Sequence, residues 1–357
     1  MDAAFRFKDD QFVIVANSIN RPEDIHVVMK KLQEYLAIEC TIKKIKISPS
    51  ANIGIVLLPT DGTEIDEIML NATSALSKSN PLGDNQYYYF NQELGCKIDE
   101  QESVKSAILA TLADESFVLH LQPKINVESN KVSGVETLVR MRDSEGNIVS
   151  PNEFIPIAEN SSLILQIGDW VLSKAHSLSL EWQQNGHQDL SISVNISDVQ
   201  FKNGASLLSK LHKLAMANDG KASNLILEIG EDIILKDVEL ATALLNEIHQ
   251  LGFQVSIDGF GSGSINLSVL KDLKIDEIKI DRQFLENVPS AEKDTSILKS
   301  MIMLGKSMNL RVVAMGVEQK EQIEILKNNY CDEFQGFYIS KPILSSEFLK
   351  WLEEYSK

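Results

Sequence analysis

Six polar side chains interrupt apolar segments after residue 115 of the sequence. They are Glu136, Asn195, Glu228, Asp258, Lys279 and Gln335. Charged groups are rarely buried in apolar strands unless they pair with an opposite charge or bind a metal. Three carboxylates and an amide oxygen form a hard oxygen-ligand set, which suits Mg²⁺, Mn²⁺ or Ca²⁺ rather than zinc. Any one of them alone is typical of a capping or salt-bridged residue, but their recurrence along successive segments favours a site.

The glycine-rich segment Gly259–Gly263 and the three cysteines carry weaker signals. The segment lacks the GxGxxG spacing of dinucleotide-binding loops and any GK[ST] sequence, so we expect a flexible loop beside the site. Cys40, Cys96 and Cys331 are odd in number and form no CxxC pair. They argue against a disulfide framework and against a zinc cluster.

The composition is that of a folded, acidic protein of 357 residues. Apolar residues make up 43% of the chain, enough for a large core. Lys and Arg number 34 against 51 Asp and Glu, and the net charge of -17 disfavours binding to a nucleic-acid polymer. No apolar run approaches the roughly 18 residues that span a bilayer, and the first ten residues do not resemble a signal peptide. We therefore expect a cytoplasmic protein, or a cytoplasmic fragment of a longer one.

The elements that position the six polar residues form a regular alternation after residue 115. Eight segments have strand character: Phe117–Ile125, Val132–Arg142, Ser191–Ile196, Leu225–Ile229, Val255–Ile257, Glu277–Ile280, Val312–Val317 and Gln335–Ile339. Amphipathic helical segments separate most of them: Leu163–Trp182, Leu207–Ala217, Val238–His249, Ser296–Met308 and Glu321–Lys327. This alternation predicts a parallel sheet, and eight repeats predict an α/β fold of the closed (β/α)8 type, with a doubly wound open sheet as the alternative. The loop between the first two strands, which contains residues 128–131, is short, so we expect an irregular, antiparallel first strand.

The first hundred residues show a smaller α+β pattern. Strands are expected at Phe12–Val15, Thr41–Ile47, Ile53–Leu58 and Gln86–Phe90, and helices at Pro22–Leu36 and Glu64–Ser77. Acidic residues followed by apolar residues at helical spacing predict a connecting helix before residue 115. We expect three parts: a partial α+β domain at 1–97, a linker helix at 98–115 and the barrel at 116–357.

The second part resembles the EAL family of cyclic di-GMP phosphodiesterases. The resemblance rests on ordered motifs: Leu121-Gln122-Pro123, Gly134–Arg140, Glu153–Glu159, Val194–Ser197, Ile278–Arg282, Arg311–Ala314 and Gln335–Phe337. Residues 1–95 resemble the C-terminal part of a GGDEF domain, through Ala51–Ile55 and Pro59–Thr63. Where that family has Gly-Gly-Asp-Glu-Phe, this chain has Lys8-Asp9-Asp10-Gln11-Phe12. We therefore expect a degenerate GGDEF domain without diguanylate cyclase activity.

The resemblance implies a metal site of which one half is altered. The ligands implied for a first divalent ion, Mg²⁺ or Mn²⁺, are all present: Glu136, Asn195, Glu228 and Asp258. The lysine implied to assist the attacking water is Lys279. The family's second ion is held by carboxylates at positions that are Gly259 and Met315 here, and neither residue binds a hard cation. We therefore expect a single ion and an incomplete catalytic site.

The resemblance implies that the nucleotide-binding residues are better preserved. Arg140 can pair with a phosphate through two parallel hydrogen bonds. The implied ligand-binding set is Gln122, Leu138, Arg140, Asn195, Asp258, Lys279, Gly316, Val317, Glu318 and Gln335. It also implies a homodimer formed through the EAL domain and a protein output partner that the sequence does not identify.

Three functions remain open at this point. The first is a cyclic di-GMP receptor that signals without hydrolysis. The second is a weakly active, metal-dependent phosphodiesterase that produces linear pGpG. The third is an interaction scaffold that binds no nucleotide, although the retained Arg140 and Gln335 argue against it.

Overall fold

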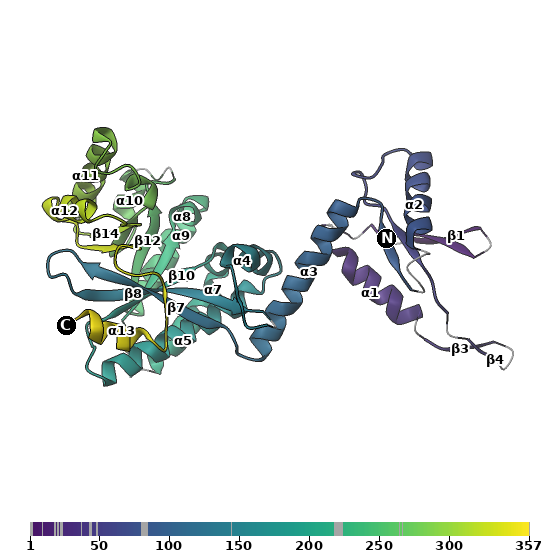
Figure 1. The fold of residues 1–357 in the computed structure, drawn as a ribbon, viewed down its shortest axis with the longest axis horizontal. Helices are drawn as coiled ribbons and strands as arrows, with labels where there is room; N and C mark the ends of the chain where they lie inside the picture. The colour runs from purple at the N-terminus through teal and green to yellow at the C-terminus, as the bar shows by residue number, and fades with distance from the viewer. Residues whose placement is uncertain are drawn as a thin grey trace. The chain divides into compact units, whose positions relative to one another are not determined.

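The computed structural model describes residues 3–356 except 9, 18, 20, 22–23, 37, 43–44, 48, 80–84, 144, 218–223, 264 and 266. The chain divides into two compact units, residues 1–107 and 108–357 (Figure 1). The division falls within helix α3 (Gln92–Ala113), which begins earlier than the connecting helix expected at 98–115. The boundaries 1–97, 98–115 and 116–357 stay a prediction.

The second unit is a closed barrel of eight strands. They are β7 (Val118–Asn126), β8 (Val132–Arg142), β10 (Ser191–Ile196), β11 (Leu225–Gly230), β12 (Gln254–Phe260), β13 (Glu277–Ile280), β14 (Arg311–Met315) and β15 (Glu333–Gln335). Neighbours from β8 through β10 to β15 pair in parallel, and β7 closes the ring by pairing antiparallel with both β8 and β15. The predicted barrel and its irregular first strand are confirmed. Two short strands, β9 (Ile148–Val149) and β16 (Ile343–Leu344), extend the sheet.

Helices connect the strands of the barrel, as the amphipathic segments predicted. They are α4 (Pro151–Asn160), α5 (Ile164–Gln184), α6 (Asp198–Lys202), α7 (Gly204–Met216), α8 (Glu231–Lys236), α9 (Val238–Gln250), α10 (Leu267–Asp272), η3 (Arg282–Phe284), α11 (Glu292–Ser307), α12 (Lys320–Asn328) and α13 (Phe348–Tyr355). Trp182 of α5 is buried and stacks on Phe348 of α13, with ring centroids 4.9 Å apart. Helices distant in the sequence are thereby joined on the outside of the barrel. Within the described part of the chain, no helix is both long and apolar enough to cross a membrane.

The last barrel strand differs from its prediction. We expected Gln335–Ile339, whereas β15 ends at Gln335. The chain turns at this point because the Val317 amide donates to the Gln335 carbonyl and the Tyr338 amide donates to the Val317 carbonyl. The apolar residues that suggested a longer strand therefore lie in a turn above the barrel rather than in its wall.

Gly336 makes that turn possible, and its replacement should destabilise the barrel. A Cβ atom at this position would lie 2.0 Å from the carbonyl oxygen of Val317 and 2.3 Å from its nitrogen. Because backbone atoms cannot yield as a side chain can, we expect Gly336→Ala to cost about 1–3 kcal/mol of unfolding free energy, measured by urea denaturation. Gly204→Ala is the control, since its Cβ would meet only the Leu244 side chain at 3.3 Å. Equal stability of the two variants would contradict this account.

Over its described residues, the first unit contains three two-stranded sheets and two helices in addition to α3. The strands are β1 (Ala3–Lys8), β2 (Gln11–Val15), β3 (Cys40–Ile42), β4 (Ile45–Ile47), β5 (Ile53–Ile55) and β6 (Tyr87–Tyr89), and the helices are α1 (Ile25–Leu36) and α2 (Ile65–Ser79). A small core gathers around Ile25, Met29, Ile55, Tyr89 and Ile98. Two predictions are corrected: the strand expected at Thr41–Ile47 is an antiparallel pair, and β1 was not expected. Pro22, at the start of an expected helix, lies outside the described residues, and so does Asp9 of the altered GGDEF motif.

Candidate functional site

The structure brings the six polar residues together at one end of the barrel. Five lie at or near the carboxyl ends of β10, β11, β12, β13 and β15, and Glu136 lies within the longer β8. The strand register fixes their neighbours: Asn195 lies opposite Glu228, and Gln122 of β7 lies opposite Glu136. The carboxyl end of the strands is where barrel enzymes place their active sites. We call this cluster the mouth.

Lys279 lies at the centre of the mouth. Its Nζ atom is 2.8 Å from Glu136 Oε2, 2.7 Å from Glu228 Oε2 and 3.4 Å from Asp258 Oδ1. The lysine side chain is completely buried, and so is that of Glu228. Burial alone would lower the pKa of Lys279, but the facing carboxylates Glu136 and Glu228 raise it well above its usual range. Lys279 is therefore protonated, although its side chain is buried.

Glu136 accepts hydrogen bonds on both carboxylate oxygens. Asn195 Nδ2 donates to Oε1 at 3.0 Å, and Gln335 Nε2 donates to Oε2 at 2.7 Å, beside Lys279. Burial raises the pKa of this carboxyl, but Lys279 and these donors outweigh it and lower the pKa to about 2. Glu136 is therefore an ionised anchor for the cluster.

Glu228 lies in a different environment, although it also contacts Lys279. Its Oε1 atom has no hydrogen-bond donor among the described residues, and the nearest cation on that side is Lys124 Nζ at 4.0 Å. Burial raises the pKa of Glu228 to about 8, despite the opposing effect of Lys279. The surroundings thus shift the pKa values of two neighbouring carboxyls in opposite directions.

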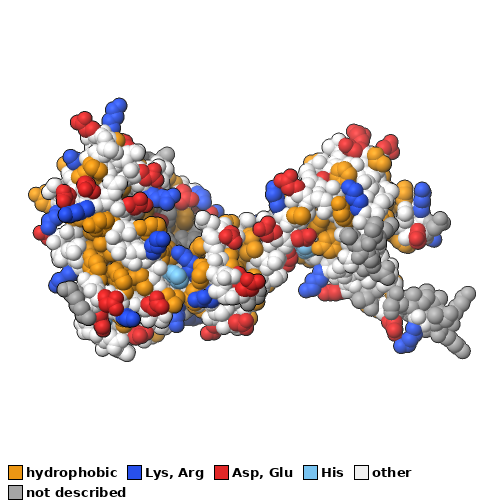
Figure 2. Space-filling view, in the orientation of Figure 1, with side chains coloured by type: hydrophobic (Ala, Val, Ile, Leu, Met, Phe, Trp, Pro, Cys, Tyr) orange, Lys and Arg blue, Asp and Glu red, His pale blue; other side chains and the backbone are white. Residues whose placement is uncertain are grey.

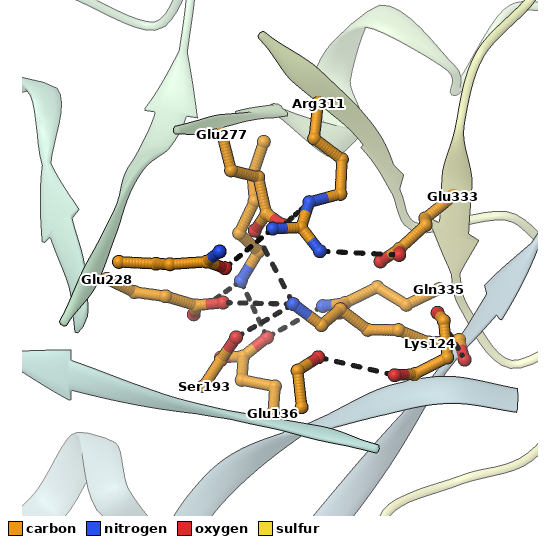
Figure 3. A network of polar contacts seen from close by, with 12 residues as sticks. Lys124, Glu136, Ser193, Glu228, Glu277, Arg311, Glu333 and Gln335 are labelled. Carbon is orange, nitrogen blue, oxygen red and sulfur yellow. Dashed lines mark hydrogen bonds and ion pairs between the residues drawn. The ribbon is translucent and has the colours of Figure 1, made fainter. Parts of the chain in front are cut away.

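A second layer of charged side chains lies below the mouth, nearer the amino ends of the parallel strands (Figure 3). Lys124, completely buried, donates to Ser193 Oγ at 2.8 Å and to Glu277 Oε1 at 3.4 Å. Arg311 Nε lies 3.2 Å from the other oxygen of Glu277, and its Nη1 lies 3.9 Å from Glu333 Oε1. The sequence interpretation missed these residues. Glu228 contacts both layers, through Lys279 and Lys124.

A periodic signal could have revealed the deeper layer. Side chains two apart on a strand point to the same face. Glu277 precedes Lys279 by two positions, and Glu333 precedes Gln335 by two. Lys124 follows Gln122 by two, because β7 runs antiparallel to the other strands. Polar residues at this spacing predict two stacked polar layers rather than one.

The glycine-rich loop above the mouth is anchored by a residue that the sequence interpretation did not use. Glu231, buried at the start of α8, accepts hydrogen bonds from the backbone amides of Gly261 at 2.8 Å and Ile265 at 2.7 Å. A Cβ atom at Gly263 would lie 2.8 Å from Glu231 Oε1, so only glycine allows this close approach. Glycine at position 263 therefore allows the loop to pack closely against the Glu231 carboxylate.

The residues implied to bind nucleotide line the same end of the barrel to different degrees. Gln122 is buried and donates to the Ser340 carbonyl at 2.8 Å. Arg140 is half-buried on β8, near Leu138, and its guanidinium donates to the Val139 carbonyl. Glu318 is exposed. Gly316 and Val317 follow β14 directly, and the Val317 amide bonds the Gln335 carbonyl. Their roles toward a nucleotide stay predictions.

The oxygen atoms of the mouth are of the kind that a hard divalent cation binds, but they do not converge on one point. Glu228 Oε1 and Asp258 Oδ1 lack hydrogen-bond donors among the described residues, as free ligand oxygens would. Over those same described residues, however, no three acidic, histidine or cysteine side chains converge closely enough to hold a metal. Lys279 lies between the carboxylates instead. Gly259 and Met315 supply no oxygen ligand from a side chain.

The face of the molecule drawn in Figure 2 carries charges of both signs. Carboxylates and cations are interspersed over the visible face, with no continuous basic surface in that view (Figure 2). Further charged groups lie inside the barrel unit, around Lys279 and Lys124.

Fold and site together define a class of protein: a (β/α)8 barrel with an antiparallel first strand and a carboxylate-rich mouth built around a buried lysine. A family model described as EAL domain matches residues 105–342, and one described as Diguanylate cyclase, GGDEF domain matches residues 1–86. The chain belongs to the EAL family. The family predicted from the motifs is confirmed in both parts of the chain.

Named relatives share this architecture. The bifunctional diguanylate cyclase/cyclic di-GMP phosphodiesterase MucR of Pseudomonas aeruginosa is 32% identical over 348 residues, 98% of this chain and 50% of its own length. The cyclic di-GMP phosphodiesterase PdeR of Escherichia coli is 28% identical over 98% of this chain and 52% of its own. The solved structure titled PaMucR Phosphodiesterase, c-di-GMP complex aligns with a TM-score of 0.65 at 32% identity, covering 69% of this chain and 99% of that one. The chain thus spans about half the length of these curated relatives.

Proposed function

We propose that this chain is a cyclic di-GMP receptor of the EAL family whose phosphodiesterase site is impaired. The observation that carries the proposal is the contrast within the mouth. Glu136, Asn195, Glu228 and Asp258 are present and gathered around Lys279, whereas Gly259 and Met315 stand where the family has carboxylates. A relative of known structure is a cyclic di-GMP complex.

The proposal includes one divalent ion, Mg²⁺ or Mn²⁺, rather than two. Glu136, Asn195, Glu228 and Asp258 are its proposed ligands. Such an ion lowers the pKa of a bound water and stabilises charge on a phosphoryl oxygen. Two-metal sites hold their ions about 3.5–4 Å apart, so each ion needs its own ligands. Glycine and methionine side chains leave the second position without them.

The nucleotide is proposed to lie across the mouth. Gln122, Leu138, Arg140, Gly316, Val317, Glu318 and Gln335 are the proposed contacts. Binding without turnover would convert ligand concentration into a conformational signal. The proposal also retains a cytoplasmic site of action, an EAL homodimer and a protein output partner, all of which rest on the sequence interpretation.

A second function, slow phosphodiesterase activity that yields linear pGpG, is favoured by the retained first-ion residues and by Lys279. The two are separated by titrating cyclic di-GMP into the protein by calorimetry, with and without Mg²⁺, and assaying the linear product in the same samples. Binding with no product supports the receptor. Binding with steady product formation supports the slow enzyme. No binding at high micromolar ligand contradicts both and supports a scaffold.

Arg140 gives the most direct test of nucleotide binding. Replacing it by alanine removes a charge-assisted contact, so we expect Arg140→Ala to weaken cyclic di-GMP binding by about 1.5–3 kcal/mol, measured by calorimetry. The matched control is Arg142→Ala, which removes an exposed guanidinium of the same strand that bonds the Gly146 carbonyl. Similar losses in the two variants would show that general charge, rather than a contact at the mouth, drives binding.

A further inference from the structure

His120 lies on the inner face of β7, at the rim of the mouth. Side chains two apart on a strand share a face, so His120 continues the row that contains Gln122 and the buried Lys124. Because β7 runs antiparallel to β8 and β15, its earlier residues lie nearer the carboxyl ends of those strands. Gln122 pairs across the sheet with Glu136 of the mouth, and His120 pairs with Leu138. The half-buried imidazole ring therefore lies directly above the mouth.

Arg140 of β8 is the diagonal neighbour of this ring. It follows Leu138 by two positions and therefore shares the face of the strand that His120 meets. Diagonal neighbours on one face of an antiparallel pair lie about 7–8 Å apart, within reach of long side chains. The two strands thus place an imidazole and a guanidinium on the same side of the sheet above the mouth.

Arg140 is a half-buried cation that has room for an anion. Its guanidinium donates to the Val139 carbonyl at 2.9 Å, and over the described part of the chain no carboxylate lies within ion-pair distance of it. Burial lowers the pKa of Arg140, while the more distant charge of Glu136 raises it. A partly desolvated guanidinium without an adjacent carboxylate is suited to an anionic ligand group.

The surroundings of His120 favour the neutral ring when no ligand is bound. Burial lowers the pKa of His120, and the positive charges of Arg140 and Arg142 lower it further. A hydrogen bond with the backbone of Pro342 and the negative charge of Glu347 oppose this shift. Strand β16, which pairs with β7 beside the ring, consists of two apolar residues. Since an unperturbed histidine titrates near pH 6.5, this ring is largely neutral at pH 7.

We propose that His120 is a second contact for a phosphate group of the nucleotide, beside Arg140, and that it takes up a proton from solvent when the nucleotide binds. A phosphate bound to Arg140 offsets part of the arginine's positive charge and places a negative charge near the ring. Both changes favour the imidazolium, which donates a charge-assisted hydrogen bond to the phosphate. This role rests on the proposed function, because Arg140 is a proposed contact of the nucleotide.

The affinity for cyclic di-GMP should therefore increase as the pH falls. Far above the pKa of the ring in the complex, the ring is neutral in both states and the affinity does not change with pH. The affinity rises as the pH falls through that pKa and becomes constant again below the lower pKa of the free protein. Each unit by which binding raises the pKa gives a total gain of about tenfold.

The test is calorimetric titration of cyclic di-GMP into the full chain at fixed Mg²⁺, at about pH 6 and about pH 8. Two buffers of different ionisation enthalpy are used at each pH, because the difference in heat counts the protons taken up. We expect the wild type to bind about 2- to 5-fold more tightly at the lower pH, with uptake of several tenths of a proton. His120→Gln keeps a hydrogen-bonding side chain that does not ionise, so it should lose this extra uptake and most of the gain. The matched control, His212→Gln, changes an exposed histidine of α7 and should behave as the wild type.

His120→Lys separates a charge effect from a structural one. A lysine carries its positive charge at both pH values, so this variant should bind at pH 8 at least as tightly as the wild type and should show no extra proton uptake. If the ring only packs against its neighbours, both His120→Gln and His120→Lys should bind weakly at each pH. That result would overturn the inference.

The wild type also gives an answer that does not depend on the folding of any variant. Nuclear magnetic resonance follows the ring Cε1–H signals of the six histidines through a pH titration, with and without cyclic di-GMP. One signal should titrate at a higher pH in the complex than in the free protein. If no histidine signal shifts its titration, the inference is wrong.

These outcomes are distinct from failure of the proposed function. The pKa of Glu228 is raised to about 8, so it titrates in the same range, but its contribution is common to the wild type and His120→Gln. The difference between those two proteins therefore isolates His120. Equal proton uptake in the two overturns the inference and leaves the receptor intact. Absence of nucleotide binding by the wild type at both pH values overturns the proposed function and this role with it.

Discussion

Restoring both missing carboxylates, by Gly259→Asp together with Met315→Glu, is expected to raise cyclic di-GMP hydrolysis by about 100-fold or more over the wild type. Each single change is expected to raise it far less. An ion with one of its anionic ligands absent binds weakly, so the two changes act as a unit and their combined effect exceeds the product of the single effects. The measurement is turnover of cyclic di-GMP to the linear product under saturating Mg²⁺.

The structure shows what each change would meet. Gly259 has a φ of +68°, in the left-handed region that Asp tolerates better than most residues. Its Cβ atom would lie 3.2 Å from Ser262 Oγ and 3.9 Å from Asp281 Oδ2. Met315 is half-buried at the end of β14, opposite Gln335. A glutamate there needs the metal to offset its partial burial.

The control for this prediction is the isosteric pair Gly259→Asn and Met315→Gln, which introduces the same shapes without charge. It should leave turnover near that of the wild type, and circular dichroism should show that all variants fold. A wild type that already hydrolyses cyclic di-GMP at about 1 s⁻¹ or faster would contradict an impaired site. So would an Asn/Gln variant as active as the Asp/Glu variant.

Removing Lys124 is expected to destabilise the barrel by about 3–5 kcal/mol, a large share of the roughly 5–15 kcal/mol that holds a domain folded. Lys124→Met removes one of the two cations that form ion pairs with the buried Glu277 among the described residues, the other being Arg311, and it also removes the donor to Ser193 Oγ. The pKa of Glu277 is held below its usual value by Lys124 and Arg311 against the effect of burial. Loss of Lys124 therefore leaves the ionised carboxylate of Glu277 with too little neighbouring positive charge.

A double-mutant cycle measured by urea denaturation gives the pairwise coupling. Lys124→Met/Glu277→Gln should be at least about 1 kcal/mol more stable than Lys124→Met alone, because removal of both partners leaves no stranded charge. Lys306→Met is the surface control, since Lys306 pairs with Asp332 at 2.7 Å while remaining 39% exposed. Its cost should stay below about 1 kcal/mol. A Lys124→Met variant as stable as Lys306→Met would contradict the buried network.

The sequence predicted the barrel and the mouth because both leave a one-dimensional signal. Polar residues such as Glu228 and Lys279 stand out in apolar strands, and the short loop between the first two strands predicted the antiparallel start. Lys124 and Glu277 interrupt strands in the same way, but no motif drew attention to them. The end of β15 was not predictable from alternation, because it is set by a hydrogen bond between Val317 and Gln335. Pairing of Lys279 with three carboxylates depends on the closure of the barrel, which the spacing of residues does not reveal.

Closure of the barrel between β7 and β15 also bears on how the chain is made. Asn126 pairs with Glu333, roughly 200 residues later. At about 5–20 residues per second, the ribosome needs roughly 10–40 s to synthesise the intervening chain. During that time β7 pairs with β8 on one edge, while the hydrogen-bonding groups of its other edge have no strand to meet. The nascent barrel therefore passes through a stage in which one edge of β7 is unpaired and open to pairing with other chains. The barrel closes when β15, the last of its eight strands to be synthesised, pairs with that edge.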